Sequence, residues 1–245
     1  MQNLVEVKNL KKSYGLKEAV KGISFKIKDD EILGLLGPNG SGKTTTIGMM
    51  LGLLKPSNGE IIIDGKKIED NRIEILKKIN FISPYIELPK KLTVKQNLIV
   101  FGKLYKIKNL NDRIDYLTSK LRLSDILNRI TGELSSGQKN RASLAKSLIN
   151  DPKVLLLDEP TASLDPEIGD FIRSFLEDYK KEKKISILLA SHNMNEVTRL
   201  CKSILMMKDG IIVDSGSPAN LIEKHGRKNL EEVFLKLSRR PNEHN

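Results

Sequence analysis

The segment that decides the fold is ILGLLGPNGSGKT, residues 32–44. An apolar run, Ile32–Leu36, leads into the glycine-rich octet GPNGSGKT, and residues 45–54 after it are predicted to form an apolar helix. Strand, glycine-rich loop and helix in this order are typical of a phosphate-binding loop, the name used from here on for residues 37–44. Its glycines allow consecutive backbone N–H groups to turn toward phosphate oxygens, and the helix N-terminus adds the positive end of its dipole.

The side chains of this loop indicate how a nucleotide would be held. Lys43 is expected to reach the β- and γ-phosphates, and the Thr44 hydroxyl is expected to bind Mg²⁺. The residues of the segment that we expect to contact the nucleotide are Gly37, Pro38, Asn39, Gly40, Ser41, Gly42, Lys43, Thr44 and Thr45. Taken alone, the loop predicts that the chain binds a nucleotide phosphate, but not which reaction it carries out.

Two adjacent acids follow a second apolar run. Residues 154–157 read Val-Leu-Leu-Leu, and Asp158 and Glu159 come directly after them. A carboxylate at the carboxyl end of a buried strand in an α/β sheet lies at the edge where ligands bind. Asp158 is therefore a candidate Mg²⁺ ligand, directly or through water, and Glu159 a candidate general base that orients the attacking water. Either acid alone is common at a strand end, but the pair favours hydrolysis.

The composition narrows the class of protein. Lys and Arg total 42 against 31 Asp and Glu, a formal net charge of +11, but aromatic residues are only 4% and Trp is absent. Because base stacking needs aromatic side chains, no nucleic-acid partner is expected. The single cysteine, Cys201, excludes an intrachain disulfide and is predicted to be a small apolar filler in a reducing compartment. The first residues do not resemble a signal peptide, and no apolar run approaches the roughly 18 residues of a membrane span.

The rest of the pattern predicts a mixed α/β chain. Short strands are expected at residues 4–7, 23–27 and 60–64, and the continuous apolar run 185–190 suits a buried parallel strand. A helical stretch is expected from about residue 92 to 127, where apolar residues recur at spacings of three and four: Leu98, Phe101, Leu104 and Tyr105. The tail from residue 229 places a second such set on one helical face: Leu230, Val233, Phe234 and Leu237.

The segment LSSGQ, residues 134–138, precedes another amphipathic pattern. Ala142, Ala145 and Leu148 would share one face of a helix that starts here. Ser135 alone is compatible with an ordinary N-cap, since serine is favoured at helix starts. From the residues alone, LSSGQ can be either an ordinary helix cap or a segment that contacts a ligand.

These motifs occur in one order along the chain. The phosphate-binding loop is followed by LSSGQ, by Asp158-Glu159, by PTASLD at residues 160–165, and by Ser191-His192 after the run 185–190. This set resembles the nucleotide-binding domain of the ATP-binding cassette (ABC) family, and the resemblance covers nearly the whole chain.

The resemblance implies roles that spacing does not supply. Tyr14 is similar to the aromatic residue that stacks on adenine, and His192 to the switch histidine that contacts the γ-phosphate. Ser135 and Gly137, with Gln138 beside them, are similar to the signature residues that contact ATP held by an opposite subunit. Two chains, identical or different, would then sandwich two ATP molecules head to tail.

A further residue, Asp165, is similar to one in the loop that communicates across that interface. The catalytic residues expected from the resemblance are Lys43, Glu159 and His192, and the expected metal ligands are Thr44 and Asp158. The fold expected is an α/β P-loop NTPase core of the ABC ATPase type, with a mixed or parallel sheet and an antiparallel β flank. Residues 1–245 are expected to form one nucleotide-binding domain, with a helical subdomain at about 90–148 and a helical tail at about 217–240.

Two residues depart from the family pattern. Ser136 stands where the signature usually has glycine, a mild change at a helix start. Pro84 stands where a glutamine that touches Mg²⁺ and water is usual, and proline has no side-chain donor or acceptor and fixes its own φ. Slower or more tightly gated hydrolysis is the hypothesis that follows.

The function that the resemblance implies is that of an ATP- and Mg²⁺-dependent motor subunit that drives transport through a separate transmembrane permease. Export is the expected direction, because residues 83–98 and the segment GRKNLEEVFLKL resemble the ATPase subunits of a transporter subgroup whose membrane domain is a separate chain, commonly an exporter or permease. Such a subunit would be cytoplasmic and attached to the inner face of the cell membrane through that permease. A soluble cassette ATPase acting on ribosomes, DNA or cofactor assembly is the alternative, and a regulatory module without turnover is a third. Simple kinases share the phosphate-binding loop but would not explain LSSGQ together with the 160–165 loop.

Overall fold

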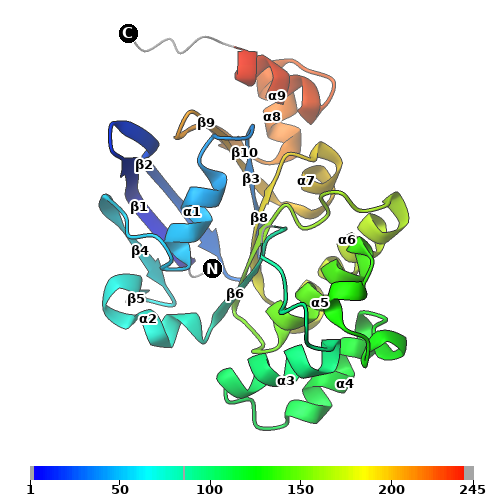
Figure 1. The fold of residues 1–245 in the computed structure, drawn as a ribbon. Coiled ribbons are helices and arrows are strands. Elements are labelled where there is room, and N and C mark those ends of the chain that lie inside the picture. Colours follow the sequence, from blue (N-terminus) through cyan, green and yellow to red (C-terminus); the bar gives the residue numbers. More distant parts are fainter. Residues whose placement is uncertain (1–2, 85, 240–245) are drawn as a thin grey trace. The chain divides into compact units, whose positions relative to one another are not determined.

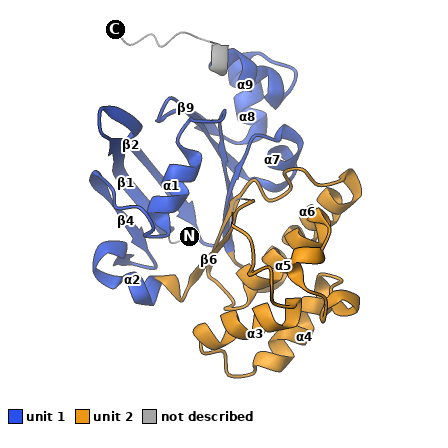
Figure 2. Cartoon of the chain, in the orientation of Figure 1, with its two compact units in different colours: residues 1–75, 186–245 blue, residues 76–185 orange. Residues whose placement is uncertain are grey.

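The computed structural model describes residues 3–84 and 86–239. Within them the chain forms two compact units, coloured blue and orange in Figure 2. Unit 1 comprises residues 1–75 and 186–245, so it is built from both ends of the chain, whereas unit 2 is the continuous segment 76–185. The region in which the sequence predicts a helical subdomain falls inside unit 2.

Unit 1 carries two sheets, seen at β1, β2 and β4 and at β3, β8 and β9 in Figure 1. Its elements are β1 (Asn3–Tyr14), β2 (Lys17–Lys28), β3 (Ile32–Leu36), α1 (Lys43–Met50), β4 (Asn58–Ile63), β5 (Lys66–Lys67), α2 (Ile68–Leu76, whose last residue is in unit 2), β8 (Ser186–Ser191), α7 (Met194–Leu200), β9 (Ser203–Lys208), β10 (Ile211–Gly216), α8 (Pro218–His225) and α9 (Leu230–Arg239). One sheet is antiparallel, with strand order β2-β1-β4-β5, and matches the predicted flank. In the other sheet β10, β9, β3 and β8 are neighbours in that order.

The apolar run before the phosphate-binding loop forms β3 as predicted. All five residues of β3 are buried, and the strand pairs in parallel with β8 on one side and β9 on the other. A strand buried on both faces needs no polar alternation, which is why its sequence is continuously apolar. β8 is likewise buried throughout and begins one residue later than predicted.

Strands β1 and β2 are longer than the sequence predicts. Burial alternates along the start of β1, where Val5 and Val7 are buried, and the register then shifts between Val7 and Leu10. Asn9 lies at this shift with a positive φ of 44°. Such an irregularity breaks the two-residue alternation on which the prediction rests, and the strand continues beyond it to Tyr14.

The β9–β10 hairpin is missing from the sequence-based expectations, although its signal is present. Two apolar runs flank the dipeptide Asp209-Gly210, and both residues have a positive φ, 47° and 84°. This is the turn chemistry typical of a two-residue hairpin.

Unit 2 combines two parallel strands with several helices. Its elements are β6 (Ile79–Ile82), α3 (Val94–Leu104), α4 (Leu110–Lys120), the 3-10 turns Ser124–Ile126 and Thr131–Glu133, α5 (Ser136–Leu148), β7 (Val154–Asp158) and α6 (Pro166–Lys183). β6 and β7 are parallel, with Ile82 opposite Leu157. The apolar face predicted for α5 is confirmed, since Ala142, Ala145 and Leu148 are fully buried.

One helical prediction needs correction, and a second is resolved into separate helices. The helix after the phosphate-binding loop ends at Met50, because Gly52 turns the chain with a positive φ of 63°. The stretch 92–127 is helical as predicted and consists of two α-helices and a 3-10 turn. Leu104, at the end of α3, is 70% exposed. Leu110 of α4 packs directly over Gly102, where a side chain would collide with it.

The C-terminal helix confirms its predicted apolar face only in part. Leu230 and Val233 are buried, whereas Phe234 and Leu237 are half-buried. Residue 240, the predicted end of the tail, lies outside the described residues. Over residues 3–84 and 86–239, none of the helices has both the length and the apolar content needed to cross a bilayer.

Candidate nucleotide-binding and hydrolysis site

The phosphate-binding loop is a closed turn between β3 and α1. The Lys43 ammonium donates to the carbonyl oxygens of Gly37 at 2.7 Å and Pro38 at 3.1 Å, and the lysine is 6% exposed. Gly42 is the N-cap of α1 with a φ of 108°, a conformation that side chains rarely tolerate. The loop backbone is therefore curled around a positive charge, beside the positive end of a helix dipole.

Neighbouring strands of unit 1 hold this loop in place. Gly210, in the β9–β10 turn, donates its N–H to the carbonyl of Ser41 at 3.1 Å. A side chain on Gly37 would collide with the Met207 carbonyl oxygen, and one on Gly42 would lie 2.7 Å from the carbonyl oxygen of Ala19. Close packing thus requires glycine at two positions of the loop.

The remaining residues of the loop differ in exposure. Asn39, Gly40 and Thr44 are exposed, and Pro38 and Thr45 are half-buried. The Ser41 hydroxyl is buried, and no group of the described residues forms a hydrogen bond with it. Buried hydroxyls are normally hydrogen-bonded, so this donor is suited to a ligand at the loop.

β8 carries His192 to the start of the phosphate-binding loop. Leu36 lies opposite Ser191 in the parallel pair β3–β8, so Gly37 and His192 both follow paired residues. The Ser191 hydroxyl donates to the buried Glu196 carboxylate at 2.8 Å and accepts from the Asn193 N–H at 3.0 Å. His192 is exposed on a turn that this network fixes.

Tyr14 ends β1 with its side chain at the surface. The residue is 49% exposed, and the Lys12 ammonium lies 5.1 Å from the centroid of its ring. An aromatic face with this exposure can stack on a planar ligand.

In unit 2 the two acids lie at the carboxyl end of β7, the strand edge predicted from the sequence. Asp158 is the last residue of the strand and is 2% exposed, and Glu159 begins the loop beyond it. Glu159 has a φ of 52°, in the left-handed region that non-glycine residues rarely adopt and that is frequent at functional positions. Because Ile82 lies opposite Leu157, β6 delivers Pro84 to the same edge as these acids.

Ser135 is the N-cap of α5, so the reading as an ordinary cap is structurally correct. The Gln138 N–H donates to the Ser135 hydroxyl at 3.3 Å, and the Ser135 N–H donates to the Gln138 side-chain carbonyl at 3.0 Å. These two bonds form a complete capping box. Ser135 and Ser136 remain exposed, so the cap does not remove them from contact with a ligand.

The start of α5 lies beside the start of α6. Gly137 is buried, and a side chain there would lie 3.3 Å from Ile168 on α6. Asp165 is the N-cap of α6. The signature residues and Asp165 are therefore placed at two neighbouring helix starts within unit 2.

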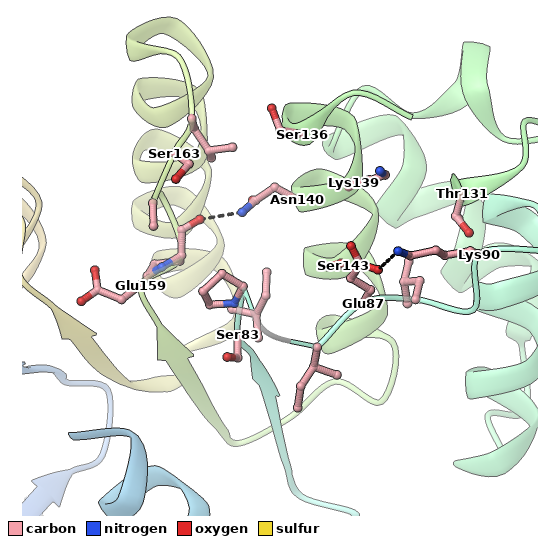
Figure 3. Close-up of a pocket in the computed structure, with 17 residues that line it drawn as sticks. Ser83, Glu87, Lys90, Thr131, Ser136, Lys139, Asn140, Ser143, Glu159 and Ser163 are labelled. Carbon is pink, nitrogen blue, oxygen red and sulfur yellow. Dashed lines mark hydrogen bonds and ion pairs between the residues drawn. The ribbon is translucent and has the colours of Figure 1, made fainter. Parts of the chain in front are cut away.

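A cavity of about 190 Å³ lies among these unit 2 elements, shown in Figure 3. It is enclosed by the segment after β6, by α5 and by the loop after β7, and Pro84, Asn140, Ser143 and Glu159 are among its lining residues. Asn140 donates to the carbonyl oxygen of Pro160 at 2.7 Å, the bond drawn in Figure 3. Sequence reasoning missed Asn140, because an amide in an amphipathic helix has no pattern that separates it from a surface residue.

The predicted residues thus form two groups. Unit 1 holds the phosphate-binding loop, Tyr14 and His192, and unit 2 holds Ser135, Gly137, Gln138, Asp158, Glu159 and Asp165. Apart from Tyr14, which ends β1, these residues lie at the carboxyl end of a buried strand or at the start of a helix, the places where α/β proteins bind phosphates.

Comparison with known proteins decides the family. A family model described as ABC transporter matches residues 20–162. The chain belongs to the ABC transporter family. The ABC transporter ATP-binding protein NatA of Bacillus subtilis (strain 168) is 35% identical over 221 residues, which make up 89% of each chain. The Nod factor export ATP-binding protein I of Rhizobium sp. (strain N33) is 36% identical over 232 residues, 94% of this chain and 76% of that protein.

Solved ABC cassettes share the fold. A dimeric structure of a post-hydrolysis state of an ATP-binding cassette, bound to ADP and Pi, is 27% identical with a TM-score of 0.80. The match covers 87% of this chain and 98% of that one. The α/β P-loop fold predicted from the sequence is confirmed, and the chain is an ABC ATPase, the nucleotide-binding motor subunit of a transporter.

Proposed function

We propose that this ABC ATPase drives export of a substrate through a separate membrane-spanning chain. The observation that carries the proposal is the placement of hydrolysis side chains directly after buried parallel strands: the phosphate-binding loop after β3, Glu159 after β7 and His192 after β8. The direction is supported by similarity to a Nod factor export protein that this chain matches over 94% of its length.

In this proposal the loop residues 37–45 bind the phosphates of ATP and Tyr14 stacks on adenine. Lys43 neutralises charge on the β- and γ-phosphates from inside the loop. The Thr44 hydroxyl and the Asp158 carboxylate are oxygen ligands of the kind that Mg²⁺ prefers, and Mg²⁺ is commonly held by one or two such groups together with substrate phosphates. When bound, Mg²⁺ supplies further positive charge at the phosphates.

Hydrolysis itself is assigned to Glu159 and His192. Glu159 accepts a proton from the attacking water and orients that water toward the γ-phosphorus. His192 donates a hydrogen bond to the γ-phosphate, from a turn that the Ser191–Glu196 bond fixes. Phosphoryl transfer requires mainly positioning and charge stabilisation, and these two groups supply both.

A second nucleotide-binding subunit, identical or different, would complete each site. Ser135, Gly137 and Gln138 would contact ATP held by the partner, and Asp165 would lie at the same interface. The exposure of Ser135 at the N-terminus of α5 supports this assignment, because a helix N-terminus attracts phosphate.

The membrane partner would dock on unit 2. Residues 84–105 include several exposed apolar side chains: Ile86 at 49%, Val100 at 44% and Leu104 at 70% exposure. Exposed apolar side chains gathered on one segment are typical of a protein contact. In this arrangement the subunit would be cytoplasmic and held at the inner face of the membrane by its permease.

The alternative is a cassette ATPase acting on ribosomes, DNA or cofactor assembly without a membrane partner. The deciding experiment is affinity purification of the Glu159→Gln form with Mg-ATP from detergent-solubilised source membranes, followed by mass spectrometry. We expect a multi-span membrane protein in about equal amount, because loss of the base leaves ATP bound and the complex closed. Recovery of soluble partners alone, such as ribosomal proteins, would favour the alternative. Glu223→Gln, a substitution in α8, is the matched control.

A further inference from the structure

The backbone of Glu159 is held in an unusual conformation by a short segment of chain. Its φ of 52° places it in the left-handed region, and Ser163, four residues later, has a φ of 59°. The Ala162 N–H donates to the Glu159 carbonyl at 3.1 Å, and Asp165 ends the segment at the start of α6. A non-glycine residue stays in this region only if its surroundings enforce it.

One side chain outside the segment contacts it at the residue next to Glu159. Asn140, on α5, donates its amide N–H to the carbonyl oxygen of Pro160 at 2.7 Å. The proline ring fixes the φ of Pro160, so a bond that holds its carbonyl also limits how the Glu159–Pro160 peptide can rotate. In Figure 3 the Glu159 carboxylate points away from Asn140, on the far side of this peptide.

The other end of the Asn140 side chain supports a dedicated role. Its Oδ1 atom is buried, and among the described residues no group donates a hydrogen bond to it. A surface amide that served only solubility would expose both polar atoms. Asn140 instead directs its donor onto the loop, and its side chain lines the same cavity as Ser143 and Glu159.

The helix that carries Asn140 is itself fixed against the segment. Gly137, one turn earlier on α5, packs against Ile168 of α6, with room for no more than a hydrogen at its Cα before neighbours must shift. α5 therefore contacts both the start of the 159–165 segment, through Asn140, and the helix that follows it, through Gly137.

We propose that Asn140 is a positioning residue for hydrolysis. The hydrogen bond from its side-chain amide to the Pro160 carbonyl oxygen sets the orientation of the Glu159 carboxylate. The proposal rests on the function proposed above for Glu159. Since α5 begins at Ser135, the same bond connects the helix start assigned to the partner's ATP with the general base of this chain's own site. In this proposal a displacement of α5 acts on the Glu159–Pro160 peptide through the Asn140–Pro160 hydrogen bond.

The test compares three substitutions on α5 in the full-length chain. Asn140→Leu keeps the approximate shape and removes the donor, Asn140→Gln keeps an amide donor, and Ser143→Ala alters the same cavity without touching the bond. Steady-state ATPase kinetics give kcat and KM, and hydrogen exchange reports the mobility of residues 158–165.

For Asn140→Leu we expect kcat to fall by about 10- to 100-fold, the effect of misplacing a catalytic group by about 1 Å, while KM for ATP changes by less than about 2-fold. Exchange in residues 158–165 should become several-fold faster. Asn140→Gln should restore much of kcat, and Ser143→Ala should match the wild type in both measurements.

Three results would overturn the proposal: an unchanged kcat in Asn140→Leu, a kcat loss without faster exchange in residues 158–165, or a loss of equal size in Ser143→Ala. Failure of this proposal for Asn140 can be distinguished from failure of the proposed ATPase function. If the wild type had no turnover at all, the assignment of hydrolysis would fail, whereas the exchange data would still decide whether Asn140 holds the segment.

Discussion

The Lys43 ammonium donates a hydrogen bond of 2.7 Å to the carbonyl oxygen of Gly37, six residues earlier in the chain. This bond closes the phosphate-binding loop around the charge that is assigned to the phosphates. Because the curled backbone is already formed, an anion can bind without much ordering of the loop, and preorganisation of this kind favours affinity.

Loss of the Lys43 charge should abolish nucleotide turnover. We expect Lys43→Ala to lower kcat/KM for ATP by at least about 100-fold, because a preorganised positive charge at the phosphates is removed. Lys17→Ala, at an exposed lysine of β2, is the control and should leave turnover unchanged. A Lys43→Ala protein that is folded and still turns over ATP would contradict the phosphate-loop assignment.

The two roles of Ser135 can be separated with a matched serine. Ser217 is the N-cap of α8 and accepts a hydrogen bond from the Asn220 N–H at 3.2 Å, as Ser135 does from Gln138. Each serine-to-alanine change should lower the free energy of unfolding by about 1 kcal/mol through loss of the cap. In the Glu159→Gln background, only Ser135→Ala should also weaken ATP-dependent dimerisation, measured by analytical ultracentrifugation. If both variants dimerise equally well, capping is the whole role of Ser135.

Pro84 should limit turnover, since it lies at the edge of unit 2 where Glu159 emerges and offers no polar side chain. We expect Pro84→Gln to raise basal ATPase activity or change its stimulation by a membrane partner. Pro84→Ala separates the effect of the fixed φ of proline from the effect of its missing polar side chain, because alanine frees the backbone without adding an amide. Turnover and stimulation that both stay unchanged in Pro84→Gln would show that the departure from the family pattern has no catalytic consequence.

Lys146 should make stability depend on pH. Its ammonium lies 4.9 Å from the Phe81 ring centroid and 5.4 Å from that of Phe101, and burial lowers the pKa of Lys146 from 10.5 to about 8. Between these two pKa values the unfolded chain binds more protons than the folded one, so this residue makes the folded state more stable as pH rises through that window.

Lys146→Met removes this titration and fills a similar volume. The difference in unfolding free energy, variant minus wild type, should become more negative by about 1–2 kcal/mol from pH 7 to pH 9.5, because the wild type alone gains stability over that range. Urea unfolding at both pH values measures the difference, and other titrating groups cancel because they are common to both proteins. A difference that is the same at both pH values would mean that Lys146 titrates normally.

Sequence patterns were informative where burial is uniform along an element. β3 and β8 are buried on every residue, and their runs of apolar letters predict them to within one position. The acids at the carboxyl end of β7 and the cap at Ser135 are also predictable, because each lies at a strand end or at a helix start. Such positions follow from local chemistry.

The remaining features depend on contacts between distant parts of the chain. The shift at Asn9 interrupts the alternation of β1, and the packing of Leu110 on Gly102 divides one helical pattern into two helices. Asn140 is important only because Pro160, twenty residues later, lies within reach of its amide. No window of neighbouring residues contains that information.

The hairpin that braces the phosphate-binding loop also sets an order for biosynthesis. The loop spans residues 37–44, but the N–H that anchors it belongs to Gly210, and both strands beside β3 come from residues 186–208. A ribosome has therefore produced the whole of unit 2, a continuous segment, before the parallel neighbours of β3 exist. The folded phosphate-binding loop can therefore form only after residue 210 has been synthesised, so a chain released before that point would hold the phosphate-binding sequence without the fold that makes it a site.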